Sequence, residues 1–224
     1  MMYTFFPLAI VAAYLLGSVP FGVLIARAHG KDLRSIGSGN IGATNVARAL
    51  GRKWAYVCFV LDVLKGAVPM LATLALVRVL IAQSQAGKVV VLWLWLAVGC
   101  AAILGHIFPI YLKFKGGKGV ATSFGVALGL WPYFTICALF AITIWVVVVL
   151  VGRYVSLASI VASVAFPLVL VMSILLTTGW EFAALWPLLI AACVIPLMVI
   201  LRHRENIKRL LAGTESKIRT NKKS

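Results

Sequence analysis

The chain has 224 residues, of which 63% are hydrophobic and only 12% are charged, and its mean hydropathy is +1.07. These values lie far outside the range of soluble domains and predict an integral membrane protein, with one domain over residues 1–224. The net charge of +16 does not indicate a nucleic-acid partner, because the basic residues gather in short clusters beside apolar segments rather than along one amphipathic face.

Apolar segments long enough to cross a bilayer follow one another along the chain. They lie at residues 5–27, 54–80, 89–111, 119–151, 154–176 and 181–201. The fourth is too long for one tilted helix, and the stretch Gly129-Leu130-Trp131-Pro132 predicts a break in it. We therefore expect an all-α polytopic membrane protein with seven transmembrane helices, one of them short.

The distribution of charge predicts how these helices are oriented. Basic residues fill the links at 27–53 and 113–118, the turn at Arg153 and the tail from Arg202 onward. The links around Gln85 and Thr178 carry few charges. Because positively charged loops stay in the cytoplasm, we expect the N-terminus outside, the C-terminus inside, and Gln85 and Thr178 outside. The same clusters can attract anionic membrane lipids and substrates.

Neither a disulfide framework nor a metal site is predicted. The four cysteines are Cys58, Cys100, Cys137 and Cys193. Each lies alone in an apolar stretch, without a CxxC pair or a histidine at metal-ligand spacing. We interpret them as small residues of the core or of the lipid-facing surface.

Three polar blocks interrupt the apolar pattern, at 36–48, 114–123 and 202–217. The first contains the polar residues Ser38, Asn40, Thr44, Asn45 and Arg48 among several glycines. Glycines let backbone amides point into a concavity, and an arginine can bind phosphate through its planar fork. A turn with helix caps would use similar residues, so this block indicates either a phosphate site or a polar turn.

The second block places Lys118 among Gly116, Gly117 and Gly119, directly before an apolar helix. Exposed amides at a helix start, with a lysine nearby, form an anion site. The spacing is not that of a Walker A loop, so no nucleotide is implied. The alternative is a flexible basic turn.

The third block contains His203, Glu205 and Asn206. On a helix, residues 203 and 206 share a face, so His203 could act there as a base or bind a phosphate. Glu205 could instead pair with neighbouring arginines and hold the tail. Asp62 and Lys65, one turn apart in an apolar segment, predict an internal ion pair, with a direct catalytic role as the alternative.

These blocks also carry a resemblance. The stretches GSGNIGATNVAR, GHIFPIYLKFKGGKGVAT and RHRENIKRLLAGTESK are together similar to the bacterial acyl-phosphate:glycerol 3-phosphate acyltransferases of the PlsY type. The likeness runs from Gly17 to Lys217. It implies transfer of a fatty acyl group from acyl phosphate to the 1-hydroxyl of sn-glycerol 3-phosphate, which gives lysophosphatidic acid and phosphate in the first step of bacterial phospholipid synthesis.

The resemblance also implies roles for individual residues. The catalytic set would be Ser38, Arg48, Lys118, His203 and Asn206. The substrate-binding set would be Asn40, Thr44, Asn45, Gly116, Gly117, Gly119 and Ser156, and Glu205 would be structural. No metal or organic cofactor is implied. The family works in the bacterial cytoplasmic (inner) membrane with its active site on the cytoplasmic face, functionally coupled to the enzyme that makes acyl phosphate.

Two other functions remain possible from the residues alone. One is a transporter of phosphorylated metabolites or lipids, although transporters place polar groups near the bilayer midplane rather than on one face. The other is a phosphotransferase or phosphatase that acts on lipid head groups. Within the acyltransferase interpretation, the general base could be His203 or an oxygen of the substrate phosphate, and we favour the substrate.

Overall fold

The structure is a computed structural model that describes residues 2–83 and 87–218. The described residues form ten α-helices and one short 3₁₀ helix, with no strand among them. The bounds are α1 Met2–Ser18, α2 Phe21–Ala28, α3 Ala43–Leu50, α4 Arg52–Gln83, α5 Lys88–Ile107, η1 Ile110–Leu112, α6 Val120–Gly129, α7 Tyr133–Gly152, α8 Val155–Leu176, α9 Phe182–Arg202 and α10 Arg204–Leu211.

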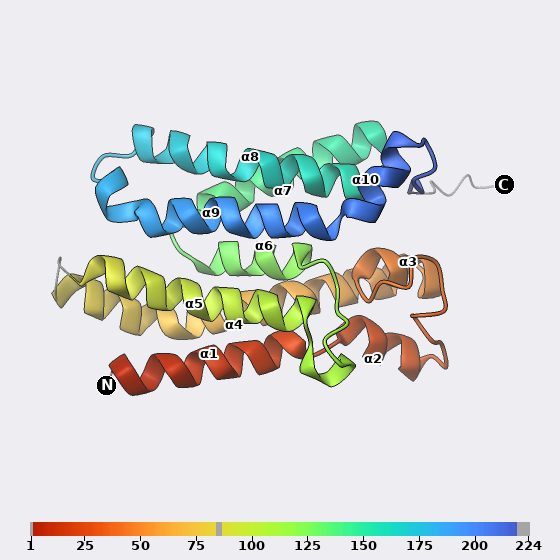
Figure 1. The fold of residues 1–224 in the computed structure, drawn as a ribbon, viewed down its shortest axis with the longest axis horizontal. Helices are drawn as coiled ribbons and strands as arrows, with labels where there is room; N and C mark the ends of the chain where they lie inside the picture. The colour runs from red at the N-terminus through yellow and green to blue at the C-terminus, as the bar shows by residue number, and fades with distance from the viewer. Residues whose placement is uncertain (1, 84–86, 219–224) are drawn as a thin grey trace.

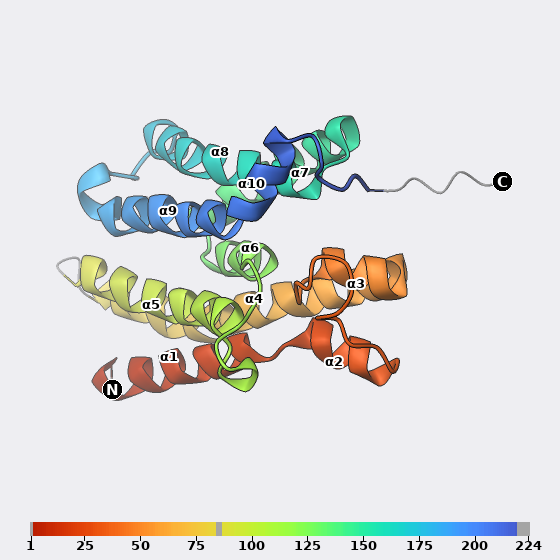
Figure 2. The same cartoon turned by 45° about the vertical axis from the view of Figure 1, so that its right-hand side comes forward.

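The helices form two groups with α6 between them (Figures 1 and 2). One group contains α1, α4 and α5, with α2 and α3 at one end. The other contains α7, α8, α9 and α10. Helix α6 packs chiefly on α4 and also contacts α5 and α7, so it joins the two groups.

The expectation of seven membrane-crossing helices, one of them short, is confirmed. Six helical segments of the described chain are long and apolar enough to span a membrane, and α6 is a shorter apolar helix. The start of α1 and helix α10 lie at opposite ends of the bundle, as an odd number of crossings requires (Figure 1). The link that contains Thr178 lies at the end opposite α10. Gln85 lies outside the described residues, and the direction of the bundle across a membrane stays a prediction.

The break expected at 129–132 is present, since α6 ends at Gly129 and α7 begins at Tyr133. A second break was not expected. The first span, predicted as continuous over 5–27, is divided at Val19 and Pro20, because proline lacks an N–H and disfavours helix in the residue before it. The carbonyl oxygen of Val19 accepts a hydrogen bond of 2.9 Å from Lys65 Nζ. The N–H of Phe21 donates to the same oxygen at 3.2 Å, so this carbonyl group inside the bundle has two donors.

Helices α4 and α6 approach each other in backbone contact. A Cβ on Gly125 would lie 1.9 Å from the carbonyl oxygen of Val63, and one on Gly66 would lie 2.2 Å from that of Thr122. Only glycine permits this spacing, which is common where transmembrane helices pack closely. The contact brings the start of α6 beside the middle of α4.

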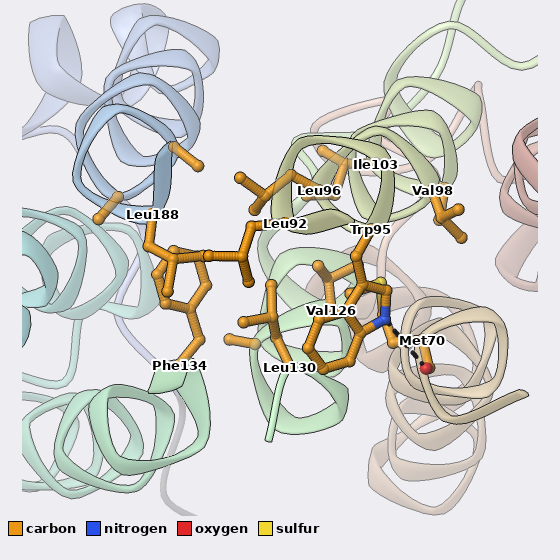
Figure 3. Close-up of a cluster of buried hydrophobic side chains, with 14 of the residues drawn as sticks. Met70, Leu92, Trp95, Leu96, Val98, Ile103, Val126, Leu130, Phe134 and Leu188 are labelled. Carbon is orange, nitrogen blue, oxygen red and sulfur yellow. Dashed lines mark hydrogen bonds between the residues drawn. The ribbon is translucent and has the colours of Figure 1, made fainter. Parts of the chain in front are cut away.

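A shared apolar core joins the two groups at the level of α6 (Figure 3). Its buried side chains include Leu92, Trp95, Leu96, Ile103, Val126, Leu130, Phe134 and Leu188. The indole Nε1 of Trp95 donates a hydrogen bond of 3.2 Å to the carbonyl of Met70. The buried polar group of this core residue is therefore satisfied.

Candidate active site

A cavity of about 960 Å³ lies where the three polar blocks meet. Its polar lining includes Ser38, Asn40, Thr44, Asn45, Arg48, Asp62, His106, Lys118, Ser123, Ser156, His203, Asn206 and Glu215. Helices α6, α7, α8 and α9 supply apolar side chains to the same cavity, among them Phe134, Trp145 and Phe166. One space is thus polar in one part and apolar in another.

The first loop is anchored by the side chain of Asn45, which is 1% exposed. Its Nδ2 donates to the carbonyl oxygens of Leu33 and Ile36 at 3.0 and 2.9 Å. Its Oδ1 accepts from the backbone N–H of Ser38 at 3.1 Å. The amide of Asn45 is therefore occupied by the loop backbone, although the residue borders the cavity.

Helix α3 follows this loop and presents polar side chains to the cavity. Asn40 Oδ1 accepts the backbone N–H of Gly42 at 2.9 Å, just before α3 begins. Thr44 and Arg48 are one helical turn apart, so both line the cavity from the same face. Arg48 is exposed and makes no hydrogen bond or ion pair with the other described residues. Its guanidinium group is available to an anion.

The second loop is held by its backbone. The N–H of Gly116 donates to the carbonyl of Ile107, and the N–H of Gly117 donates to that of His106, both at 3.1 Å. These two glycines are buried and do not line the cavity. Their amides are thus occupied by backbone carbonyls, and a role for them in binding phosphate stays a prediction. Lys118 and Gly119 are the loop residues of the predicted set that reach the cavity.

The third block is linked to the second through Asn206, which the carboxylate of Glu215 holds in turn. Lys118 Nζ donates to Oδ1 of Asn206, and Nδ2 of Asn206 donates to Oε1 of Glu215 at 2.6 Å. Ser156 Oγ donates to the same oxygen at 2.7 Å, and Arg209 Nε donates to Oε2 at 2.7 Å. This network holds the lysine, α8, α10 and the C-terminal segment together.

Glu205 lies elsewhere. Its side chain is 61% exposed and pairs with Arg204 at 3.7 Å and Lys208 at 3.8 Å, and it does not line the cavity. Such surface pairs contribute little to stability. The contacts that a structural acid would make belong to Glu215, and a structural role for Glu205 stays a prediction.

Burial and neighbouring charges shift the pKa values of three groups at the cavity. Burial lowers the pKa of Lys118 to about 8, against the attraction of Glu215. Burial, aided by the nearby charge of Lys118, lowers the pKa of His203 to about 4. Burial opposes the charge of Glu215, but hydrogen bonds from Asn206, Ser156 and Arg209 outweigh it and lower the pKa. At neutral pH the site therefore holds an ammonium group, a neutral imidazole and a carboxylate.

The neutral ring of His203 has a defined orientation. Its Nδ1 lies 2.8 Å from the carbonyl oxygen of Val199, an arrangement in which Nδ1 carries the hydrogen. Nε2 is then left as a hydrogen-bond acceptor. His203 is 3% exposed and lines the cavity, so a hydroxyl group of a bound ligand could donate to it.

A buried charged cluster forms the wall beside the second loop. The predicted ion pair is present, with Lys65 Nζ 2.8 Å from Asp62 Oδ1. His106, which the sequence did not single out, has its Nδ1 3.7 Å from the same oxygen. Asp62 and His106 are 2% and 4% exposed and both line the cavity, whereas Lys65 does not.

Comparisons with known proteins agree with one another. Residues 7–213 match the family model described as glycerol-3-phosphate acyltransferase. The chain is 45% identical over 208 residues to the glycerol-3-phosphate acyltransferase of Aquifex aeolicus, covering 92% of this chain and 95% of the relative. It is 43% identical over 211 residues to that of Geotalea daltonii, with 92% and 94% covered.

The chain belongs to the glycerol-3-phosphate acyltransferase family. Two crystal structures of PlsY, an integral membrane member, are similar to it. The glycerol 3-phosphate form has 43% identity and a TM-score of 0.78, and the lysophosphatidic acid form has 42% identity and a TM-score of 0.76. Each covers 96% of both chains. The comparisons support an acyltransferase and not the transporter.

Two residues that line this candidate site, Glu215 and His106, were not predicted from the sequence. Glu215 lies in the third block, where the resemblance implied a structural role for Glu205 instead. The helical period offered a signal, because residues 203 and 206 share a face and residue 205 points away from it. His106 gave no such signal, since a single histidine at the end of an apolar segment is most often a core residue.

Proposed function

We propose that this acyltransferase moves a fatty acyl group from acyl phosphate to the 1-hydroxyl of sn-glycerol 3-phosphate, which yields lysophosphatidic acid and inorganic phosphate. The observation that best supports this proposal is one cavity that is lined by cationic side chains in one part and by apolar side chains in the adjoining part. One substrate is a soluble anion, and the other joins an acyl chain to a phosphate. A cavity of this kind accommodates both. The crystallised relatives in glycerol 3-phosphate and lysophosphatidic acid forms support the same assignment.

The apolar part has the shape that an acyl chain needs. Phe134, Ala138, Ile142 and Trp145 line it from one face of α7. They span about 16 Å along the helix at its usual rise per residue. Aliphatic carbons buried along this stripe would contribute binding energy in proportion to their area. The phosphate end of the donor then lies toward Lys118 and Arg48.

The reaction needs positioning more than activation. The oxygen of the glycerol hydroxyl attacks the acyl carbonyl carbon, the bond from that carbon to the phosphate oxygen breaks, and phosphate leaves with the bonding electrons. Lys118, Arg48 and Ser38 would hold the two phosphates so that hydroxyl and carbonyl meet. The positive charges of Lys118 and Arg48 also stabilise negative charge that develops on the leaving phosphate.

The hydroxyl proton goes to an oxygen of the leaving phosphate. His203 is a weak acceptor for it, because a pKa of about 4 lies far below that of a phosphate monoester, roughly 6. The imidazole Nε2 would instead accept a hydrogen bond from the hydroxyl and orient it. His203→Gln, which keeps an acceptor, should retain measurable activity and the wild-type pH profile, whereas His203→Ala should be badly impaired. Equal loss in both variants, folded and able to bind both substrates, would favour the histidine as base.

The activity is tested with purified protein in detergent. Acyl phosphate and glycerol 3-phosphate are supplied together, and mass spectrometry detects lysophosphatidic acid while phosphate release is measured. We expect both products in equal amounts, and both at a strongly reduced rate with Lys118→Met. Phosphate without the ester would indicate a phosphatase and overturn the proposal.

We further propose that the protein lies in the bacterial inner membrane with this cavity on the cytoplasmic side, functionally coupled to the enzyme that makes acyl phosphate. The basic links gather at the cavity end, as the positive-inside rule requires. Lys113→Cys and Thr178→Cys, on a background without the four native cysteines, report the orientation. An impermeant maleimide added to intact cells should label Thr178→Cys alone. Labelling of Lys113→Cys instead would reverse the topology.

A further inference from the structure

The second loop rests on a side chain that the proposed reaction does not use. A Cβ on Gly117 would lie only 2.1 Å from Nε2 of His106, so the backbone of this glycine lies directly against the imidazole ring. The N–H of Gly117 donates to the carbonyl of the same histidine at 3.1 Å. On its other side, the carbonyl of Gly117 accepts from Arg202 Nη2 at 3.1 Å. The glycine is thus held between α5 and α9, one residue before Lys118.

The imidazole ring is itself held in place. His106 is 4% exposed, and its Nδ1 faces Oδ1 of Asp62 at 3.7 Å without a hydrogen-bond partner among the described residues. Asp62 is fixed by Lys65 at 2.8 Å, and Lys65 donates to the carbonyl of Val19. The Val19 carbonyl at the unexpected break between α1 and α2 therefore holds Lys65, and Lys65 holds the Asp62 carboxylate beside the ring.

We propose that His106 is a positioning residue for the second loop: its ring is the platform that fixes Gly117 and so places the ammonium group of Lys118 in the cavity. Asp62 keeps the ring in position. The inference rests on the proposed function, because it takes the substrate phosphates as the ligands of Lys118. Displacement of a binding group by about 1 Å can cost as much as a hundredfold in rate, so a platform of this kind controls binding through the residue that it places.

The test is a double-mutant cycle. Gly117→Ala places a methyl group where the ring lies, and His106→Ala removes the ring. Each single variant should lower kcat/KM for glycerol 3-phosphate by about tenfold or more, chiefly through KM. In the His106→Ala background, Gly117→Ala should lower kcat/KM by less than about twofold, because the added methyl group then has room.

Gly116→Ala is the matched control. A Cβ on Gly116 would lie 2.2 Å from the backbone oxygen of His106 and 2.4 Å from Cδ of Pro109, atoms that His106→Ala leaves in place. Its cost should therefore be the same in both backgrounds. If Gly117→Ala also costs the same in both, the ring is not the platform and the inference fails.

Folding is checked by the thermal midpoint of each purified variant. If His106→Ala does not fold, the cycle is measured with His106→Gln, whose flexible amide can move aside. In that background the loss of kcat/KM caused by Gly117→Ala should be at least threefold smaller than in the wild type. An equal loss in both backgrounds overturns the inference. His106→Gln should also keep kcat near the wild-type value. A large fall in kcat at unchanged KM would place His106 in the chemistry and equally overturn it. If the wild-type protein makes no lysophosphatidic acid, the proposed reaction itself is refuted. That result is distinct from the two outcomes that overturn the role of His106.

Discussion

The two glycine-rich loops at the cavity have similar compositions but are supported in opposite ways. In the loop over residues 36–42, the side chain of Asn45 bonds to backbone groups, and Ser38 and Asn40 of the loop itself line the cavity. In the loop over 114–119, backbone groups bond to α5, and Lys118 and Gly119 reach the cavity. A glycine-rich polar block therefore does not reveal whether its glycines contact a ligand or support the residue that does.

The difference has a functional consequence. The first loop offers several polar groups that can share a ligand, together with Arg48 of the helix that follows it. The second loop contributes its charge through Lys118, which Asn206 holds in turn. We therefore expect single substitutions to be most damaging along the path from the second loop to the third block, and less damaging in the first loop.

Lys118→Met should have the largest effect. Methionine has a similar length but carries no charge, so the anion loses its cation and Asn206 loses its donor. We expect kcat/KM for glycerol 3-phosphate to fall by about a hundredfold or more, as for loss of a buried charged partner. The control is Lys113→Met in the same loop, because Lys113 is exposed and outside the cavity. A loss below about fivefold with Lys118→Met would contradict the comparison.

Glu215→Gln and Glu205→Gln form a matched pair. Glutamine at 215 can place its carbonyl oxygen where Oε1 accepts from Asn206 and Ser156, but its amide nitrogen cannot accept from Arg209, and the negative charge near Lys118 is lost. Loss of one hydrogen bond to a charged group predicts a fall in kcat/KM of about tenfold. Glu205→Gln should stay within about twofold, since that side chain is 61% exposed. The reverse order of effects would restore Glu205 as the structural acid.

The breaks in the helices show what could be predicted from sequence. The break before α7 was visible because Gly129 and Pro132 lie together in a segment too long for one span. The break at Pro20 was not, because the apolar run continues past it and the ammonium group of Lys65, which bonds to the Val19 carbonyl, lies 46 residues later. Local sequence identifies where a helix can end. A distant partner determines whether it does.

The candidate site likewise contains features that local sequence predicts and contacts that depend on distant residues. Residues 203 and 206 were correctly paired, because helical geometry is local, and both line the cavity. Glu215 reaches Asn206 only because the chain after α10 folds back, with the N–H of Glu215 bonded to the carbonyl of Arg209 at 3.1 Å. The burial of Gly117 against His106 likewise depends on the return of the chain after α5. Neither contact has a periodic signal in the sequence.

Asn45→Asp tests the anchor of the first loop. The aspartate keeps the acceptor for the Ser38 N–H, but it loses both donors and faces two carbonyl oxygens instead. We expect the thermal midpoint to fall by about 4 to 8 °C, as two lost hydrogen bonds imply, with a roughly fivefold rise in KM. Asn40→Asp is the control for stability, because aspartate keeps the Oδ1 atom that accepts the N–H of Gly42. Equal midpoints in the two variants would show that Asn45 is not the anchor.

The smallest effect concerns pH and again isolates the second loop. With a pKa of about 8, Lys118 is charged at pH 7 and loses its charge as the pH rises through 8. Since the free-enzyme pKa appears in kcat/KM, the value for glycerol 3-phosphate should fall about fourfold by pH 8.5. His203, Glu215 and the substrate do not account for this decline, because the pKa of His203 is about 4, that of Glu215 is lowered, and substrate phosphate ionises near 6. Lys118→Arg, whose guanidinium stays charged, should therefore give a lower but flat profile between pH 7 and 9, and the same decline in that variant would assign the titration to another group.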